Sequence, residues 1–117
     1  MNRKILSIVP IILIVLGAGC AQKISPEEFK RLKEKGIEHA KKEEFIQAVE
    51  MLEKASNAKP EDTQIYPYLA ESYEHLQQYD KAIETWQKLI YISPRNSPEA
   101  EEGLAKLKEL ESRHKTK

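Results

Sequence analysis

The chain has little of several things that common functional classes require. Among its 117 residues are one cysteine, four glycines and six prolines. A single cysteine cannot form an internal disulfide, and so few glycines and prolines leave little room for the many turns of an all-β fold. Basic and acidic residues both number 19, so no basic excess is available to neutralise phosphates. We therefore expect one helical domain that does not bind nucleic acid.

Long hydrophobic runs are also scarce, and the one that exists lies at the N-terminus. Arg3 and Lys4 precede a nearly unbroken apolar run at residues 5–16, and small residues follow it. This layout is typical of a secretory signal peptide, and we predict a cleavable one at residues 1–19. A membrane-spanning helix needs roughly 20 apolar residues. The run is shorter and contains Pro10, so an uncleaved transmembrane helix is the alternative.

The single cysteine, Cys20, directly follows this leader in the stretch LGAGC. The stretch resembles the lipobox of bacterial lipoprotein precursors, although Leu16 lies one residue earlier than in the commonest form. The resemblance implies cleavage before Cys20 and a diacylglycerol thioether on its sulfur, often with a further acyl chain on the new amino terminus. Two or more acyl chains give stable anchoring. A plain signal peptide with an incidental cysteine is the other interpretation of this stretch.

The same resemblance implies a location. It predicts a lipid-anchored protein of the cell envelope, joined to its domain by a short linker at residues 20–25. The residue after the cysteine is Ala21, and the sorting rule of Gram-negative lipoproteins retains those with aspartate there at the inner membrane. The outer membrane, facing the periplasm, is therefore favoured over the inner membrane if the source is Gram-negative.

From Ser25 onward the pattern is helical and repeats with a period of 34 residues. The segment AVEMLEKASNAKP, residues 48–60, aligns with AIETWQKLIYISP, residues 82–94. A period of 34 with these small and large positions resembles the tetratricopeptide repeat (TPR). The first-helix pattern of that repeat is also present in the second copy, from Tyr66 to Tyr73, and more weakly in the first copy.

The resemblance implies an all-α fold. We expect a right-handed α-α superhelix of two TPR hairpins, residues 26–62 and 63–96, with a C-terminal capping helix at residues 97–117. Small side chains would let paired helices approach, large ones would fill the space between repeats, and prolines would end each second helix. The predicted packing positions are Gly36, Ala48, Leu52, Ala55, Pro60, Ala70, Tyr73, Ala82, Trp86 and Pro94.

Local signals predict how individual helices begin and what they bury. Ser-Pro-Glu sequences at Ser25 and Ser97 are typical N-caps, and Glu28 is placed to close a capping box. On the last helix, three pairs of opposite charge stand four residues apart and are expected to support an exposed face: Glu102–Lys106, Glu109–Arg113 and Glu111–Lys115. The expected apolar stripe of that helix is Ala100, Leu104, Leu107 and Leu110.

No pattern in the sequence is typical of catalysis or metal binding. His39, His75 and His114 have no short metal-ligand spacing. There is no phosphate-binding glycine loop and no nucleophile elbow, and no nearby base in the sequence would activate the thiol of Cys20. We therefore expect no enzyme, no metal and no cofactor.

The resemblance also implies a concave binding face built by the first helix of each repeat. Its candidate residues are Lys30, Lys33, Ile37, Ala40, Lys41, Gln64, Pro67, Glu71, Glu74 and His75. The face would be basic at one end and acidic at the other, which favours a protein or peptide ligand of opposite polarity. One TPR subclass clamps the carboxylate tail of heat-shock chaperones. That clamp is absent, because Ile37, Tyr68 and Glu102 occupy places that it fills with asparagine or basic residues.

The sequence thus predicts a membrane-anchored protein-interaction adaptor. By family analogy alone, it would help to assemble a cell-envelope complex such as a pilus, a secretion apparatus or outer-membrane machinery. The alternative is a structural module that self-associates. Repeat stacks usually need three or more units, so a homodimer would bury the exposed ends of this shorter one.

Overall fold

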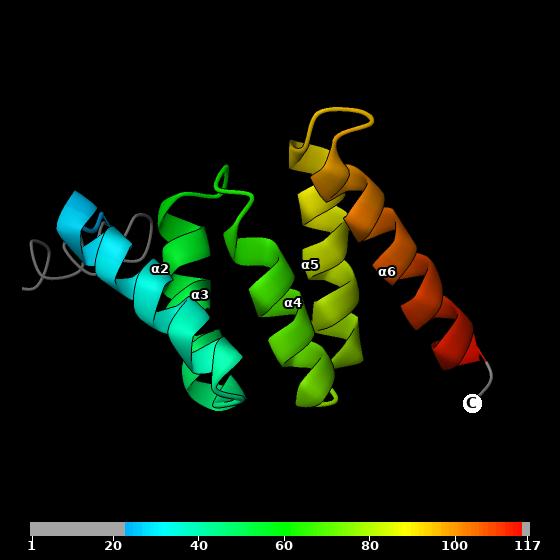
Figure 1. The fold of residues 1–117 in the computed structure, drawn as a ribbon, viewed down its shortest axis with the longest axis horizontal. Helices are drawn as coiled ribbons and strands as arrows, with labels where there is room; N and C mark the ends of the chain where they lie inside the picture. The colour runs from blue at the N-terminus through cyan, green and yellow to red at the C-terminus, as the bar shows by residue number, and fades with distance from the viewer. Residues whose placement is uncertain (1–22, 116–117) are drawn as a thin grey trace, which may run out of the picture.

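The computed structural model describes residues 23–115, and within that range the secondary structure is α-helix with no strand. The helices are α2 (Pro26–Lys41), α3 (Phe45–Ala58), α4 (Ile65–His75), α5 (Tyr79–Ile92) and α6 (Pro98–Lys115). Figure 1 shows them side by side in chain order, from α2 at one end to α6 at the other. The all-α prediction is therefore confirmed. The predicted signal peptide and Cys20 lie outside the described residues, and no helix within 23–115 is long and apolar enough to cross a bilayer.

The helices form two hairpins, and α6 follows as an added layer. α2 packs on α3, and α4 packs on α5. The hairpins meet where α3 contacts α4, and α2 also touches α4. α6 covers α5 at the far end of the row. The largest fully buried side chains, Leu52, Ile65, Trp86 and Leu89, lie between these layers.

The turns inside the two hairpins have the same geometry. Two residues beyond the end of each first helix stands a residue with a positive φ, Glu43 at 62° and Gln77 at 59°. These two residues are 34 positions apart. In the first turn, the amide of Glu44 donates to the carbonyl of His39 at 2.9 Å. In the second, the amide of Gln78 donates to the carbonyl of Tyr73 at 2.8 Å. Both are Schellman motifs, which satisfy carbonyls that the helix itself leaves free.

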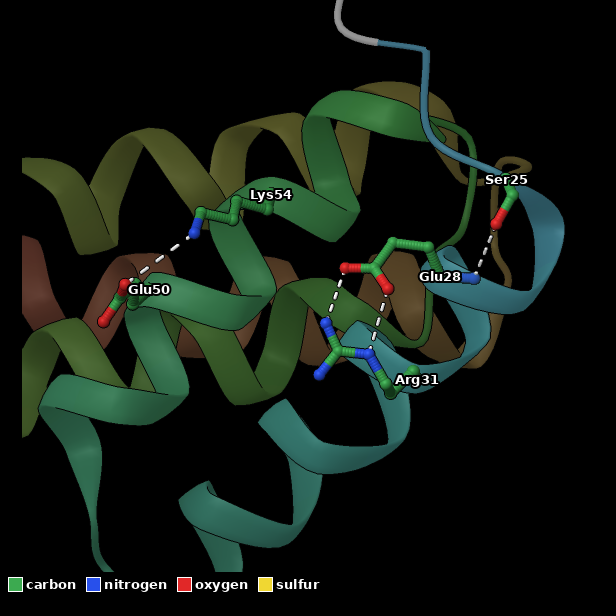
Figure 2. Close-up of polar contacts among 5 residues, drawn as sticks. All are labelled: Ser25, Glu28, Arg31, Glu50 and Lys54. Carbon is green, nitrogen blue, oxygen red and sulfur yellow. Dashed lines mark hydrogen bonds and ion pairs between the residues drawn. The ribbon is translucent and has the colours of Figure 1, made fainter.

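The N-caps form largely as expected, but the capping box does not. The hydroxyl of Ser25 accepts from the amide of Glu28 at 3.1 Å, and the hydroxyl of Ser97 accepts from the amide of Ala100 at 3.2 Å. The carboxylate of Glu28 turns instead to Arg31, which donates from its guanidinium at 3.0 and 2.6 Å (Figure 2). That hydrogen bond lowers the pKa of Glu28. Arg31 offers two donors to this carboxylate, whereas the capping box would offer one backbone amide, which accounts for the difference.

Gly36 allows α2 and α3 to approach closely. A Cβ placed on Gly36 would lie 2.6 Å from the Cδ2 atom of Leu52, whose side chain is fully buried. At the opposite end of the stack, Gly103 has the same role, since its Cβ would lie 2.8 Å from the Cγ1 atom of Ile90. The remaining small packing positions, Ala48, Ala55, Ala70 and Ala82, have no exposed surface.

Two predicted packing residues do not pack. Pro60 and Pro94 are both exposed, and each stands two residues beyond the end of its helix, α3 or α5. Because proline excludes helical geometry for the residue before it, these prolines act on the backbone at the helix end and contribute no side chain to the core.

The apolar stripe predicted for α6 is wrong at one position. Leu104 is 45% exposed, whereas Leu110 is 2% exposed. The buried face runs through Ala100 and Gly103 to Leu110. Since Gly103 is the point of close approach to α5, it sets which face of α6 turns inward. Leu104 lies one residue further round the helix, at the edge of that face.

The outward face of the first hairpin is charged. Ile65 and Leu69 of α4 are buried against the preceding hairpin. The residues 34 positions earlier are Arg31 and Lys35, and both are exposed. Figure 2 shows the Arg31–Glu28 pair on this hairpin together with a second pair on α3. The charges mark this side as an end of the stack.

Candidate protein-binding groove

Three helices, α2, α4 and α6, form the walls of a groove of about 560 Å³. We call it the concave groove. Its lining is mixed in character: apolar side chains lie beside one lysine and several glutamates. The lining residues are Ile37, Lys41, Thr63, Gln64, Pro67, Tyr68, Glu71, Glu99 and Glu102.

A second depression, of about 230 Å³, adjoins the concave groove and shares Lys41, Tyr68 and Glu71 with it. It lies toward the C-terminal ends of α2 and α4. An aromatic pair closes it: Phe45 and His75 stack with ring centroids 4.2 Å apart and planes inclined by 4°. The two depressions together provide one continuous surface across α2 and α4.

Most residues predicted for the concave face line these depressions. They are Ile37, Ala40, Lys41, Gln64, Pro67, Glu71 and His75. Two pairs at equivalent repeat positions, Ile37/Glu71 and Lys41/His75, line the depressions from both repeats, whereas each of the other predicted pairs contributes one member only. Lys30, Lys33 and Glu74 do not line either depression.

Lys33 and Lys30 each lie beside an acidic residue outside the groove. Lys33 donates to the carboxylate of Asp62 at 2.7 Å, in a pair whose side chains are 20% and 17% exposed. Asp62 also accepts from the amide of Gln64, so Lys33 anchors the loop between α3 and α4. Lys30 lies 3.9 Å from Glu34 and is well exposed. The basic end of the groove therefore consists of Lys41 alone.

Glu74 faces the neighbouring helices and not the groove. Its carboxylate accepts from the indole nitrogen of Trp86 at 3.0 Å and lies 3.6 Å from the guanidinium of Arg113. Its side chain is 16% exposed. The sequence prediction missed this because the partners come from α5 and α6, far along the chain. Glu74 links these three helices in place of meeting a ligand.

The structure adds groove residues that the sequence did not indicate as a site. Tyr68 lies at the centre, since it lines both depressions, and Glu99 and Glu102 contribute a third wall from α6. A signal existed for one of them, because Glu102 stands 34 residues after Tyr68 and so holds the same repeat position. The other added lining residues are Thr63, Glu43, Phe45 and Ser72.

A further cleft of about 430 Å³ lies on the side of α3 and α5, with α4 residues among its lining. The hydroxyl of Tyr73 donates there to the carboxylate of Glu53. Burial and this hydrogen bond raise the pKa of Tyr73. The hydroxyl of Tyr66 donates to the carbonyl of Pro60 at 2.5 Å. These tyrosines join α4 to the first hairpin.

The described residues contain no group of three or more histidine, cysteine, aspartate or glutamate side chains placed to hold a metal ion. No curated protein is detectably similar to the chain. The family model of the tetratricopeptide repeat matches residues 39–107, more than half of the chain. That span runs from the end of α2 into α6, through the repeated turns and the groove-lining helix α4. The chain therefore belongs to the tetratricopeptide repeat family.

Proposed function

We propose that this protein is a membrane-anchored interaction adaptor whose concave groove binds a segment of another protein. TPR repeats generally mediate protein–protein interaction. The observation that carries the proposal is the groove itself, in which α2, α4 and α6 present apolar, aromatic and charged side chains to one space. We assign the protein no catalytic activity.

The membrane anchor is proposed from the leader and the LGAGC stretch. Four residues separate Cys20 from Ser25, and four extended residues reach roughly 14 Å. A lipid on Cys20 would hold the first hairpin close to the bilayer. In this proposal the protein faces the periplasm from the outer membrane, and its partner belongs to an envelope assembly. That last step rests on family analogy.

The anchor is tested by expressing the parent chain and Cys20→Ala in a bacterial host and labelling with an alkyne fatty acid. The parent is expected to incorporate label, lose the leader and sediment with membranes. Cys20→Ala is expected to remain unlabelled and uncleaved. A Cys20→Ala protein that stays membrane-bound at the mass of the parent would instead establish the uncleaved transmembrane helix.

The groove is tested separately by photocrosslinking in intact cells, with a photoreactive phenylalanine at Tyr68. A matched control places the same group at Gln87, an exposed position on α5 outside both depressions. A crosslinked product that forms from the group at Tyr68 and not from the group at Gln87 supports binding in the groove. Equal products at both positions would argue against it.

Self-association is the second candidate, and the exposed Leu104 of α6 favours it. The charged face of Arg31 and Lys35 makes continuation of the stack beyond the first hairpin unfavourable. A homodimer would therefore use α6. Sedimentation of the parent and Leu104→Glu in the same detergent decides the question: a dimer that Leu104→Glu dissociates supports it, and a stable monomer removes it.

A further inference from the structure

We propose that the concave groove selects a protein segment that carries lysine or arginine, and that the basic side chain binds beside Glu99 and Glu102 of α6. This inference rests on the proposed function and specifies its partner. It depends on three features of the structure: the balance of charge in the groove, the partners of its acidic residues, and the apolar surface beside them.

The balance of charge in the concave groove is acidic. Glu71, Glu99 and Glu102 line it, and Lys41 is its one basic lining residue. Because Glu71 is paired with Lys106, the excess consists of Glu99 and Glu102 against Lys41. Lys33 would have added a second positive charge, but its ammonium is held by Asp62 at 2.7 Å. A groove with this excess attracts cationic segments and repels acidic ones.

Lys106, the partner expected for Glu102, pairs with another helix instead. The sequence predicted a Glu102–Lys106 pair along the helix. In the structure the Lys106 ammonium lies 3.6 Å from the carboxylate of Glu71 on α4. Within residues 23–115, Glu99 and Glu102 form no ion pair. They are three residues apart on one helix face, where like charges repel, and a bound cation would relieve that repulsion.

The surface next to these glutamates suits the rest of such a segment. Ile37 and Pro67 are half-buried on the groove walls and can contact an apolar residue. The ring of Tyr68 already has a cation over it, since the Lys41 ammonium lies 5.8 Å from its centroid. Lys41 also repels a basic residue at its own end, so the ligand's positive charge belongs at the α6 side.

The test selects peptides from a random phage-displayed library on the full chain held in phosphatidylcholine nanodiscs. Peptides that lose binding to Gln64→Trp are taken as groove-dependent, because Gln64 is an exposed lining residue and tryptophan fills the space without changing charge. The groove-dependent peptides are expected to be enriched in lysine and arginine. Their affinity is expected to fall as salt is raised.

The test variants and their control replace pairs of glutamates on the same helix, α6. E99K/E102K is expected to weaken the binding of the selected peptides at least about tenfold, because the exchange removes the attraction of two carboxylates and adds the repulsion of two ammonium groups. E99Q/E102Q removes the attraction alone and is expected to weaken binding by less. E101K/E111K is the control, since Glu101 and Glu111 are exposed on α6 outside the groove. It is expected to change affinity less than about twofold.

The outcomes separate failure of the charge selection from failure of the proposed function. Groove-dependent peptides that lack basic residues, or that bind E99K/E102K as tightly as the parent, overturn the charge selection and leave the groove as a binding site. A library that yields no groove-dependent peptide overturns the proposed function together with this inference. Circular dichroism of each variant verifies that it is folded.

Discussion

The spacing of the first hairpin depends on one residue that has no side chain. The atoms that a Cβ at Gly36 would meet belong to the buried Leu52, at 2.6 and 2.7 Å, and to Met51, at 3.3 Å. Real side-chain contacts are not this short, so a larger residue must displace Leu52 or the helix. Close packing leaves few free spaces into which Leu52 could move.

We expect Gly36→Ala to destabilise the fold by about 1 kcal/mol. Overpacking costs about 1–3 kcal/mol, and the better helix propensity of alanine returns about 1 kcal/mol. In a Leu52→Ala background the same change is expected to be stabilising, because the conflicting atoms are gone. Urea unfolding of the parent, the two single variants and the double variant gives the free energies of this double-mutant cycle. Stabilisation by Gly36→Ala in the parent would contradict the proposed close approach.

Tyr73 provides a second residue-scale prediction, which concerns pH. Burial and the hydrogen bond to Glu53 raise its pKa, so the fold favours the neutral phenol. That contribution is fully present below the ordinary tyrosine pKa of about 10 and is lost as the pH rises toward the raised value. Tyr73→Phe is expected to cost about 1 kcal/mol near neutral pH and to lose less stability than the parent above about pH 10.

The control for this experiment is Tyr91→Phe, because Tyr91 is 89% exposed. Tyr91→Phe is expected to match the parent in stability near neutral pH and in the stability that is lost at alkaline pH. Thermal unfolding between neutral and alkaline pH measures all three proteins. Identical alkaline losses for Tyr73→Phe and the parent would show that Tyr73 does not ionise in the unfolding range.

At the scale of elements, the two hairpin turns are built alike but without glycine. Glu43 and Gln77 both adopt positive φ, a conformation that costs a residue with a Cβ about 1–2 kcal/mol. Glycine is the usual choice at this position of a Schellman motif. The turns therefore hold a small amount of removable strain.

Gln77→Gly is expected to stabilise the second hairpin by about 0.5–1 kcal/mol, because relief of the strained φ exceeds the entropy cost of glycine. Gln87→Gly makes the same substitution within α5, where glycine costs about 1 kcal/mol. The two variants should thus shift the midpoint of urea unfolding in opposite directions. A shift of the same sign in both variants would show that the positive φ of Gln77 does not strain the turn.

α6 offers an element-scale test of which face it buries. Leu110→Ala is expected to cost about 2–3 kcal/mol, since Leu110 is 2% exposed. Leu104→Ala is expected to change stability by less than about 0.5 kcal/mol, since Leu104 is 45% exposed. The free energy of unfolding is again the measurement. Equal losses would mean that α6 packs with a different rotation.

At the scale of the whole molecule, the two ends of the helix row differ. The first hairpin ends the row in Arg31 and Lys35, where the second hairpin has the buried Ile65 and Leu69. These charges oppose head-to-tail stacking of copies of the chain. Without them, such stacking could add further copies and form an open-ended filament. The two ends of the stack are therefore not interchangeable as interaction surfaces.

We predict that Arg31→Ile combined with Lys35→Leu will cause self-association that increases with concentration. The double variant copies the apolar pair of α4 onto an exposed face and creates a surface able to stack. Arg31→Gln with Lys35→Gln removes the same charges without adding apolar surface and should behave as the parent. Sedimentation velocity over a concentration series is the measurement, and an unchanged mass for the apolar variant would contradict the role given to the charges.

The helices of this protein and their order can be predicted from the amino-acid sequence. The period of 34 residues predicts two helical hairpins, and the Ser-Pro-Glu sequences predict the starts of α2 and α6. The small residues Gly36 and Ala48 predict close helix approach. These features could be predicted because they depend on residues that are near one another in the chain or repeat at a fixed interval.

Which polar side chains meet across different helices depends on how the helices pack. Lys106 pairs with Glu71 and not Glu102, Lys33 is held by Asp62, and Glu74 lies against Trp86. Long charged side chains reach partners on neighbouring helices, and those partners depend on helix rotation and spacing that no local pattern specifies. The rotation of α6, set where Gly103 meets Ile90, is what turns its glutamates toward the groove and makes the groove acidic.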